Sequence, residues 1–211
     1  METRPTPDDE ARRFWEARYE RHAHAWSGRP NAVLVDETAD LRPGRALDLG
    51  CGEGSDAVWL AERGWDVTAT DVSPTALERG AAAAAHAGVS SRLDWQQHDL
   101  AATFPAGRYA LVTSHYMHAP DGSLDERILT QAAAAVAPGG TLLVVGHAAV
   151  PPWGSNGTAF LPAPADVLAA LGLPAPGWRV VACDARSRQA TGPHGEIGDL
   201  VDSVVKAVRV A

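Results

Sequence analysis

The sequence predicts an α/β domain in which helices cover both faces of a doubly wound, mostly parallel sheet. Five short segments rich in apolar residues alternate with segments of helical periodicity, which is typical of a parallel sheet buried on both faces. The last part of the chain departs from this alternation, because two long strands separated by a turn at residues 192–195 indicate an antiparallel hairpin. The length of 211 residues suits one domain around one large core.

Each expected element has a local signal. The parallel strands are short apolar runs, and we expect them at 46–49, 66–70, 92–97, 109–114 and 141–146. Capping residues or following glycines and prolines predict helices at 8–26, 31–41, 55–63, 73–88, 125–137 and 165–171. Ser55 and Ser73 are the expected N-caps of their helices. The strands of the hairpin are expected at 178–185 and 200–210.

The acidic balance of the chain and its few cysteines narrow the possible functions. A formal net charge of −8 makes the chain a poor candidate for binding the phosphate backbone of nucleic acids. No apolar run approaches the roughly eighteen residues of a membrane helix, and the polar N-terminus is unlike a secretory signal. The two cysteines suggest neither a disulfide framework nor a zinc site. We therefore expect a cytoplasmic monomer or dimer with no metal and no nucleic-acid or membrane partner.

Three glycines follow the first strand at alternate positions. In a doubly wound sheet, ligands bind outside the carboxyl ends of the strands. Gly50, Gly52 and Gly54 stand at such an end, where glycine allows a sharp turn and a close approach of a ligand to the backbone. Asp71 ends the second strand and is placed to accept hydrogen bonds from ribose hydroxyls. The spacing therefore predicts a nucleoside ligand.

The charges around the glycines distinguish between nucleosides. A dinucleotide fingerprint has a third glycine where this chain has Ser55, and it faces a pyrophosphate. Here Asp48, Glu53 and Asp56 surround the loop with negative charge, which disfavours a pyrophosphate. The same charges suit a cation that carries an ammonium and a sulfonium, as S-adenosyl-L-methionine does. A nicotinamide-dependent oxidoreductase is therefore the weaker alternative.

The motif Asp48–Gly54 resembles the glycine-rich motif of class I S-adenosylmethionine-dependent methyltransferases. Further motifs of that family follow in order. Asp71-Val72-Ser73 resembles the acidic end of the second strand, and His98-Asp99-Leu100 resembles the motif after the third. Residues 109–114 and 138–141 resemble the fourth strand and the turn into the fifth, so the resemblance covers about Arg29 to Val210.

This resemblance implies a Rossmann-like methyltransferase fold with a seven-stranded sheet in the order 3-2-1-4-5-7-6, in which strand seven is antiparallel. It also implies S-adenosyl-L-methionine as the cofactor and S-adenosyl-L-homocysteine as its product. Asp71 would bind the ribose hydroxyls, and Asp99 would bind the adenine amino group. The expected cofactor-binding residues are Trp26, Asp48, Gly50, Cys51, Gly52, Asp71, Val72, Ser73, Asp99, Leu100 and Ser114.

The aromatic N-terminal segment makes the resemblance more specific. Phe14, Trp15 and Trp26, followed by Ser27–Asn31, are similar to the start of small bacterial methyltransferases of the thiopurine and tellurite-resistance type. In those proteins an aromatic N-terminal segment closes over the cofactor. The resemblance implies a helical lid at residues 1–30, a methyltransferase domain at residues 31–211, and a small-molecule acceptor with a sulfur, selenium, tellurium, oxygen or nitrogen nucleophile.

Histidines follow the fourth and fifth strands, where the reactive methyl group should project. His115 and His147 are the candidate catalytic bases, and His118 lies close to the first of them in sequence. Each could instead be a buried, hydrogen-bonded histidine or a solvated one. Nucleic-acid methyltransferases that modify amino groups have a Pro-Pro-aromatic motif after the fourth strand, which residues 114–117 lack. A non-catalytic regulator that binds S-adenosylmethionine remains an alternative.

Overall fold

A computed structural model describes residues 7–117, 125–150, 153, 161–192 and 195–210. The strands are β1 (Arg45–Leu49), β2 (Asp66–Asp71), β3 (Leu93–Gln97), β4 (Tyr109–His115), β5 (Val136–His147), β6 (Trp178–Thr191) and β7 (Ile197–Arg209). The helices are α1 (Pro7–Arg21), α2 (Ala32–Thr38), α3 (Ser55–Glu62), α4 (Pro74–Ala87), α5 (Glu126–Ala135) and α6 (Pro164–Ala170). A short 3₁₀ turn covers Ser90–Arg92. No helix in these described ranges is long and apolar enough to cross a membrane.

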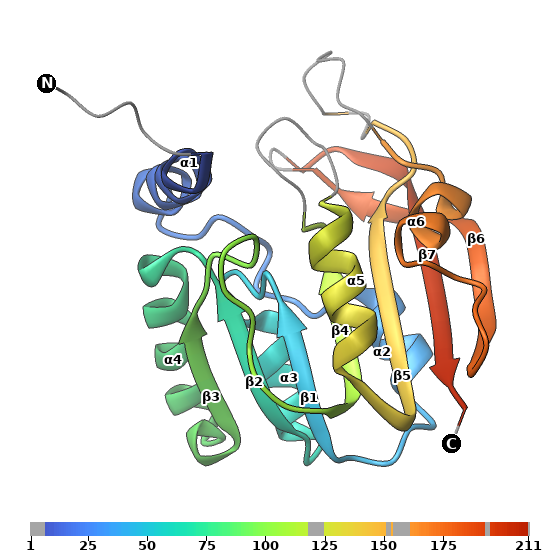
Figure 1. Ribbon diagram of the computed structural model, residues 1–211. Helices are drawn as coiled ribbons and strands as arrows, with labels where there is room; N and C mark the ends of the chain where they lie inside the picture. Colours follow the sequence, from blue (N-terminus) through green and yellow to red (C-terminus); the bar gives the residue numbers. More distant parts are fainter. Residues whose placement is uncertain (1–6, 118–124, 151–152, 154–160, 193–194, 211) are drawn as a thin grey trace, which may run out of the picture.

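The strands form one seven-stranded sheet in the order β3-β2-β1-β4-β5-β7-β6 (Figure 1). The pairs among the first five strands are parallel, whereas β5 pairs antiparallel with β7, and β7 pairs antiparallel with β6. This arrangement confirms the predicted fold class and the strand order that the resemblance implies. The carboxyl ends of β1, β2 and β4 meet at one edge of the sheet, where the N-terminal segment also lies (Figure 1).

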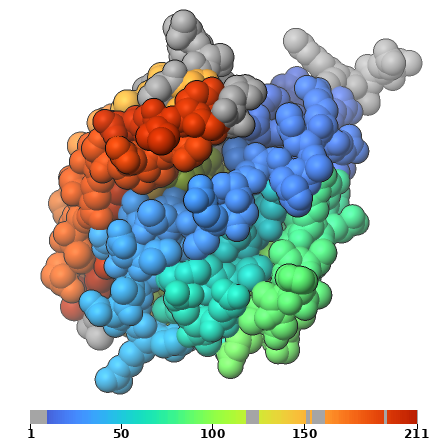
Figure 2. Space-filling model, turned by 180° about the vertical axis from the view of Figure 1, so that it is seen from behind, coloured from blue at the N-terminus to red at the C-terminus, as the bar shows by residue number. Residues whose placement is uncertain are grey.

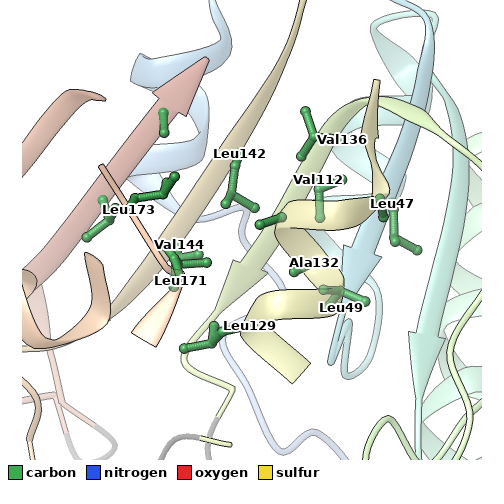
Figure 3. Packing of buried hydrophobic residues seen from close by; sticks show 14 of the residues in the cluster. Leu47, Leu49, Val112, Leu129, Ala132, Val136, Leu142, Val144, Leu171 and Leu173 are labelled. Carbon is green, nitrogen blue, oxygen red and sulfur yellow. The ribbon is translucent and has the colours of Figure 1, made fainter. Parts of the chain in front are cut away.

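Apolar side chains form a core on each face of the sheet. One cluster lies between the sheet and the helices α5 and α6, and Figure 3 shows its members from β1, β4, β5 and α5 interdigitating. The second cluster lies on the other face, where α2 and α3 supply Leu34 and Leu60, both fully buried. Burial on both faces explains why the central strands are continuous apolar runs rather than alternating ones.

The start of α3 differs from the sequence prediction. Ser55 was expected to be the N-cap, but Gly54 occupies that position with a φ of +79°, and Ser55 is the first helical residue. The prediction was wrong because the left-handed glycine turns the chain directly into the helix, so no side-chain cap is needed there. The expected cap at Ser73 is confirmed, since its Oγ accepts a hydrogen bond from the amide of Ala76 at 3.1 Å.

Other boundaries move because long-range pairing extends or ends the elements. The expected first helix ends at Arg21 rather than at Trp26, and the second ends at Thr38. The hairpin strands are longer than expected, because β6 and β7 pair from Trp178 opposite Arg209 to Thr191 opposite Ile197, with one shift of register between Val180 and Ala182. The turn predicted at 192–195 includes residues 193 and 194, which lie outside the described residues. The two long strands β6 and β7 therefore form an antiparallel hairpin at the edge of the sheet, next to the parallel strands.

Candidate functional site

The three glycines after β1 adopt the left-handed conformation that their spacing suggested. Their φ angles are +68° at Gly50, +54° at Gly52 and +79° at Gly54, a region that favours glycine. A Cβ built at Gly50 would lie 2.9 Å from Met117 Cγ, and one at Gly52 would lie 3.0 Å from Tyr19 Oη. Side chains from outside the loop therefore approach its backbone closely, and neither glycine has room for a larger residue.

Asp71 joins the glycine loop to the turn after β2. The residue is 7% exposed; its Oδ2 accepts a hydrogen bond from the amide of Gly52 and its Oδ1 one from the amide of Ser73, both at 2.9 Å. Burial raises the pKa of the Asp71 carboxyl, although the backbone donors oppose the shift. The carbonyl of Val72 accepts a hydrogen bond from Gln97 Nε2 at 3.1 Å. These bonds hold the two loops in a fixed relation to each other.

The turn after β3 continues the same edge of the sheet. Asp99 is partly exposed, and its Oδ1 accepts a hydrogen bond from the amide of Ala101 at 3.1 Å, while Leu100 is buried. Because β3, β2 and β1 are neighbours, Asp99, Asp71 and the glycine loop lie at adjacent strand ends. The structure therefore brings together the three motifs that the sequence singled out.

A buried carboxylate lies beneath the glycine loop. Asp48 is 2% exposed, and its Oδ1 accepts a hydrogen bond from Thr113 Oγ1 at 3.1 Å. Within the described residues its Oδ2 has no hydrogen-bond partner. Burial, together with repulsion from Asp56, raises the pKa of Asp48 to about 7, and His115 opposes this shift. An unpaired buried oxygen of this kind is costly without a partner and suits a cationic ligand.

His115 lies inside the molecule rather than on its rim. Its side chain is 5% exposed, and its Nδ1 lies 2.7 Å from Asp56 Oδ2. Burial alone would lower the pKa of His115, but attraction by Asp56 outweighs it, so the pKa is raised. Asp56 is fixed by the amide of Asn31, which donates to its Oδ1 at 2.6 Å. This arrangement pairs the imidazole of His115 with a carboxylate on α3.

His147 belongs to a second polar cluster, at the end of β5. Its Nδ1 lies 3.7 Å from Oδ1 of Asp202, and its side chain is 25% exposed. Asp202 is fully buried and accepts hydrogen bonds from Tyr116 Oη at 2.9 Å and from Arg188 Nε at 2.5 Å. His118 lies outside the described residues. Of the candidate histidines in the described part, His147 is thus the more accessible.

Two further expected residues lie in the loop and beside it. Cys51 donates its amide to the carbonyl of Thr70 at 2.8 Å, and burial raises the pKa of its thiol. A thiol with a raised pKa is a poor nucleophile. Ser114 is 2% exposed and pairs in register with Leu49 of β1 and Val144 of β5. Both residues therefore lie next to the glycine loop at the carboxyl ends of the strands.

The N-terminal segment is tied by hydrogen bonds to an ion pair between the glycine loop and α4. Glu53 Oε1 lies 2.8 Å from Arg79 Nη1, and the Glu53 carboxylate also accepts hydrogen bonds from the amides of Ala25 and Trp26. Arg79 in turn donates to the carbonyl of Tyr19 at 3.0 Å. Figure 2 shows the blue N-terminal segment beside a hollow that the red C-terminal strands border on the other side.

Trp26 belongs to the N-terminal segment, and its side chain is 45% exposed. Its Nε1 donates a hydrogen bond to Tyr19 Oη at 3.1 Å, and both side chains lie close to Gly52. Helix α1 is anchored further by Glu16, which accepts hydrogen bonds from the hydroxyl groups of Ser73, at 2.5 Å, and of Thr75. The helix is therefore held against the start of α4.

Sequence reasoning missed several residues of these clusters: Tyr19, Arg79, Arg188 and Asp202. Only Asp202 carried a usable signal, because it is the one carboxylate of the mostly apolar stretch Leu200–Val205 within β7. A fully buried charge is rare unless it is paired. The other residues are brought to the site by packing between elements far apart in the chain.

Comparison with known proteins gives a match over the first part of the domain. Residues 46–140 match a family model described as "Methyltransferase domain". The chain is 30% identical over 113 residues to ribosomal RNA small subunit methyltransferase C of Alcanivorax borkumensis, covering 52% of this chain and 34% of that protein. It is 33% identical over 117 residues to a probable chloroplastic tocopherol O-methyltransferase of Oryza sativa subsp. japonica, covering 54% and 32%. The chain thus spans about a third of the length of these relatives.

Solved structures match more of the chain at lower identity. TehB from Haemophilus influenzae superposes with a TM-score of 0.67 at 16% identity, covering 86% of this chain and 62% of TehB. Magnesium protoporphyrin IX methyltransferase from Synechocystis, solved with bound SAH, superposes with a TM-score of 0.62 at 18% identity, covering 99% and 90%. These similarities show that the chain has the same fold.

Proposed function

We propose that this chain, whose residues 46–140 form a class I methyltransferase domain, transfers a methyl group from S-adenosyl-L-methionine to a small molecule. The observation that carries the proposal is the edge formed by Gly50, Gly52 and Asp71 above Oδ2 of Asp48, which has no hydrogen-bond partner among the described residues. At that edge a ligand can approach the backbone closely, and a buried carboxyl group lies beneath it. A nucleoside that carries a positive charge requires both features. S-adenosyl-L-homocysteine would be the product.

The residues present fit this cofactor. Asp48 has a buried oxygen without a partner among the described residues, which the ammonium group would satisfy. Asp71 uses its two oxygens for backbone amides, yet a carboxylate accepts about four hydrogen bonds, so it can also bind ribose hydroxyls. Asp99 would bind the adenine amino group. Trp26, Cys51, Val72, Ser73, Leu100 and Ser114 complete the proposed site, and Tyr19 and Met117 border it at the glycines.

We propose that the methyl acceptor is a small molecule that binds in the same site, next to the cofactor. The chain has a net charge of −8, which opposes binding to a nucleic acid. One relative is named for ribosomal RNA and another for tocopherol, and the acidic charge favours the second class. The two cysteines, Cys51 and Cys183, are free, as suits a cytoplasmic protein, and a monomer or dimer would suffice. Sulfur, selenium, tellurium, oxygen and nitrogen nucleophiles are all compatible with the transfer.

The reaction needs alignment more than activation. The sulfonium of the cofactor already activates its methyl group, so the protein mainly holds the acceptor atom in line with the breaking bond. We propose that residues 1–30 act as a lid over the domain formed by residues 31–211. The hydrogen bonds from the amides of Ala25 and Trp26 to Glu53, and from Arg79 to the carbonyl of Tyr19, would hold this lid closed. Closure excludes water from the reacting atoms.

Calorimetric titration with S-adenosyl-L-methionine and S-adenosyl-L-homocysteine tests the proposal. We expect both to bind the parent protein, and we expect Asp71→Asn to weaken binding by about 10- to 100-fold, since a hydrogen bond to a charged group contributes about 1.5–3 kcal/mol. Asp66→Asn is a matched control, because Asp66 starts the same strand and is paired with Arg92 on the surface. Absence of binding by the parent protein would refute the proposed function. Equal affinity of the parent protein and the Asp71→Asn variant would refute only the role of Asp71.

A further inference from the structure

We infer that His147 is the general base of the transfer, that Asp202 positions it, and that the acceptor atom is an oxygen or nitrogen that loses a proton as it is methylated. This inference rests on the proposed function and specifies its acceptor class. It depends on a cluster formed by four strands: His147 from β5, Tyr116 just after β4, Arg188 from β6 and Asp202 from β7.

The orientation of His147 directs one ring nitrogen toward Asp202 and the other away from it. His147 ends β5 and pairs in register with Asp202 of the antiparallel strand β7. Its Nδ1 is buried and faces Asp202 Oδ1 at 3.7 Å, within the range of an ion pair, while a quarter of the side chain is exposed. Because Nδ1 and Nε2 lie on opposite sides of the ring, Nε2 points away from Asp202. Such contacts are often long in a ligand-free site and shorten when substrate binds.

Asp202 is held as a fixed anion. Its Oδ1 accepts a hydrogen bond from Tyr116 Oη at 2.9 Å and its Oδ2 accepts one from Arg188 Nε at 2.5 Å, while Arg188 Nη2 donates to Tyr116 Oη at 2.8 Å. Burial alone would raise the pKa of Asp202, but bonds from His147, Arg188 and Tyr116 outweigh it and lower that pKa. A carboxylate that faces Nδ1 favours the tautomer with a proton there, which leaves the lone pair on Nε2.

Tyr116 fixes the plane of the imidazole. Its ring lies against that of His147, with 4.4 Å between the ring centroids and 31° between the planes. Tyr116 also has a φ of +52°, the one non-glycine residue in the described part of the chain with a positive φ. A strained backbone of this kind persists only where the surroundings enforce it, and it is common at functional sites. Tyr116 and Asp202 together determine both the rotation and the tautomer of His147.

The cluster is continuous with the proposed cofactor site. Met117 follows Tyr116 in the chain and contacts Gly50 of the glycine loop, so only two residues separate the loop from the imidazole of His147. The charged group that faces His147 is Asp202, which is itself paired with Arg188. The other candidate base, His115, is paired with Asp56, and its side chain is 5% exposed. Of these two candidate bases, His147 is therefore the one placed to take a proton from an acceptor.

The proposed step balances without a further reagent. The acceptor atom gives its proton to Nε2 of His147 while its lone pair forms the bond to the methyl carbon. The bond between sulfur and that carbon breaks, and its electron pair stays on sulfur, which becomes a neutral thioether. The imidazolium is stabilised by Asp202 and later returns the proton to water. Hydroxyl and protonated nitrogen acceptors need such a base, whereas a thiolate or chalcogen anion that is already ionised does not.

A pH–rate profile on a panel of phenols, alcohols, amines and thiols tests the inference. We expect the preferred acceptor to be a hydroxyl or nitrogen acid and the rate of the parent protein to fall on the acid side. His147→Asn should lose this acid limb and reduce kcat by about 10²- to 10⁴-fold, with unchanged affinity for S-adenosyl-L-methionine. Added imidazole should restore part of the rate to His147→Ala. His86→Asn, on the exposed end of α4, is the control that should keep the parent profile.

The positioning role of Asp202 has its own readout. Asp202→Asn should lower kcat while leaving KM for the acceptor and the affinity for S-adenosyl-L-methionine unchanged, because the imidazole loses the carboxylate that orients it. If this variant does not fold, Tyr116→Phe removes one hydrogen bond to Asp202 and should lower kcat by less, with KM again unchanged. The inference is overturned if His147→Asn keeps the parent profile, or if thiols are the preferred acceptors at a rate that His147→Asn leaves unchanged. Failure of the cofactor to bind would instead refute the proposed function.

Discussion

Replacing Asp48 by asparagine should make the stability of the ligand-free protein less dependent on pH. Burial raises the pKa of Asp48 from 3.8 to about 7, so the native state holds a proton that the unfolded chain releases. A carboxyl group whose pKa is raised on folding contributes stability below its unfolded pKa and loses it as pH rises through the folded value. The side chain introduced by Asp48→Asn carries no such proton, so the stability of the variant would lack this loss.

The size of the effect follows from the two pKa values. Each unit of difference corresponds to about 1.4 kcal/mol, so the shift from 3.8 to about 7 amounts to about 4 kcal/mol over the full range. Between about pH 5.5 and about pH 8.5, the parent protein should lose about 2 kcal/mol relative to the variant. The cost of burying the asparagine amide is the same at every pH, so it cancels when the two proteins are compared across pH.

Urea unfolding at a series of pH values measures this difference without ligand. Asp66→Asn is the control, because the side chain of Asp66 is 67% exposed and lies at the opposite end of β2. A difference in free energy of unfolding that stays constant from acid to alkaline pH would refute the reasoning, since only a buried, titrating carboxylate changes it with pH. The proposed role of Asp48 adds that the same variant should bind S-adenosyl-L-methionine more weakly.

Two further predictions concern the glycine loop and the lid. Gly54→Ala should lower the thermal midpoint of unfolding more than Gly88→Ala. Both glycines have a positive φ, but only a Cβ at Gly54 would collide with Trp95, and such overpacking costs about 1–3 kcal/mol. Equal shifts of the two variants in differential scanning calorimetry would contradict this prediction. Glu53→Gln should weaken the hydrogen bonds that the Glu53 carboxylate accepts from the amides of Ala25 and Trp26, and so speed limited proteolysis of the N-terminal segment while the core remains folded; unchanged cleavage would show that this carboxylate does not hold the segment.

The sequence predicted the fold and the glycine loop because both depend on local patterns. Alternating apolar and helical segments specified the parallel sheet, and the spacing of Gly50, Gly52 and Gly54 specified the turn. Local patterns failed where pairing decides the outcome. Ser55 has the chemistry of an N-cap, but the backbone of Gly54 makes the turn. The hairpin strands extend beyond their apolar runs because each strand continues to find a partner in the other.

The polar clusters depend on contacts that no local pattern contains. The pairing of His115 with Asp56 requires α3 to pack against the end of β4, and these residues are far apart in the chain. The cluster around Asp202 requires the register that places His147 opposite it, together with a long side chain from β6. Sequence identified the histidines as candidates but not their carboxylate partners, because partner choice is decided by the pairing of β5, β7 and β6.

The two histidines show why exposure and partner must be considered together. His115 and His147 both end an apolar strand, and each faces a carboxylate through its Nδ1. Side chains alternate between the faces of a strand, and His115 lies on the face that α3 covers. Its imidazole is therefore enclosed and is paired with the negative charge of Asp56. His147 stands at the rim, where its carboxylate partner is already neutralised by Arg188. A base needs a partner that orients it and a second nitrogen that remains accessible, and among these two residues only His147 has both.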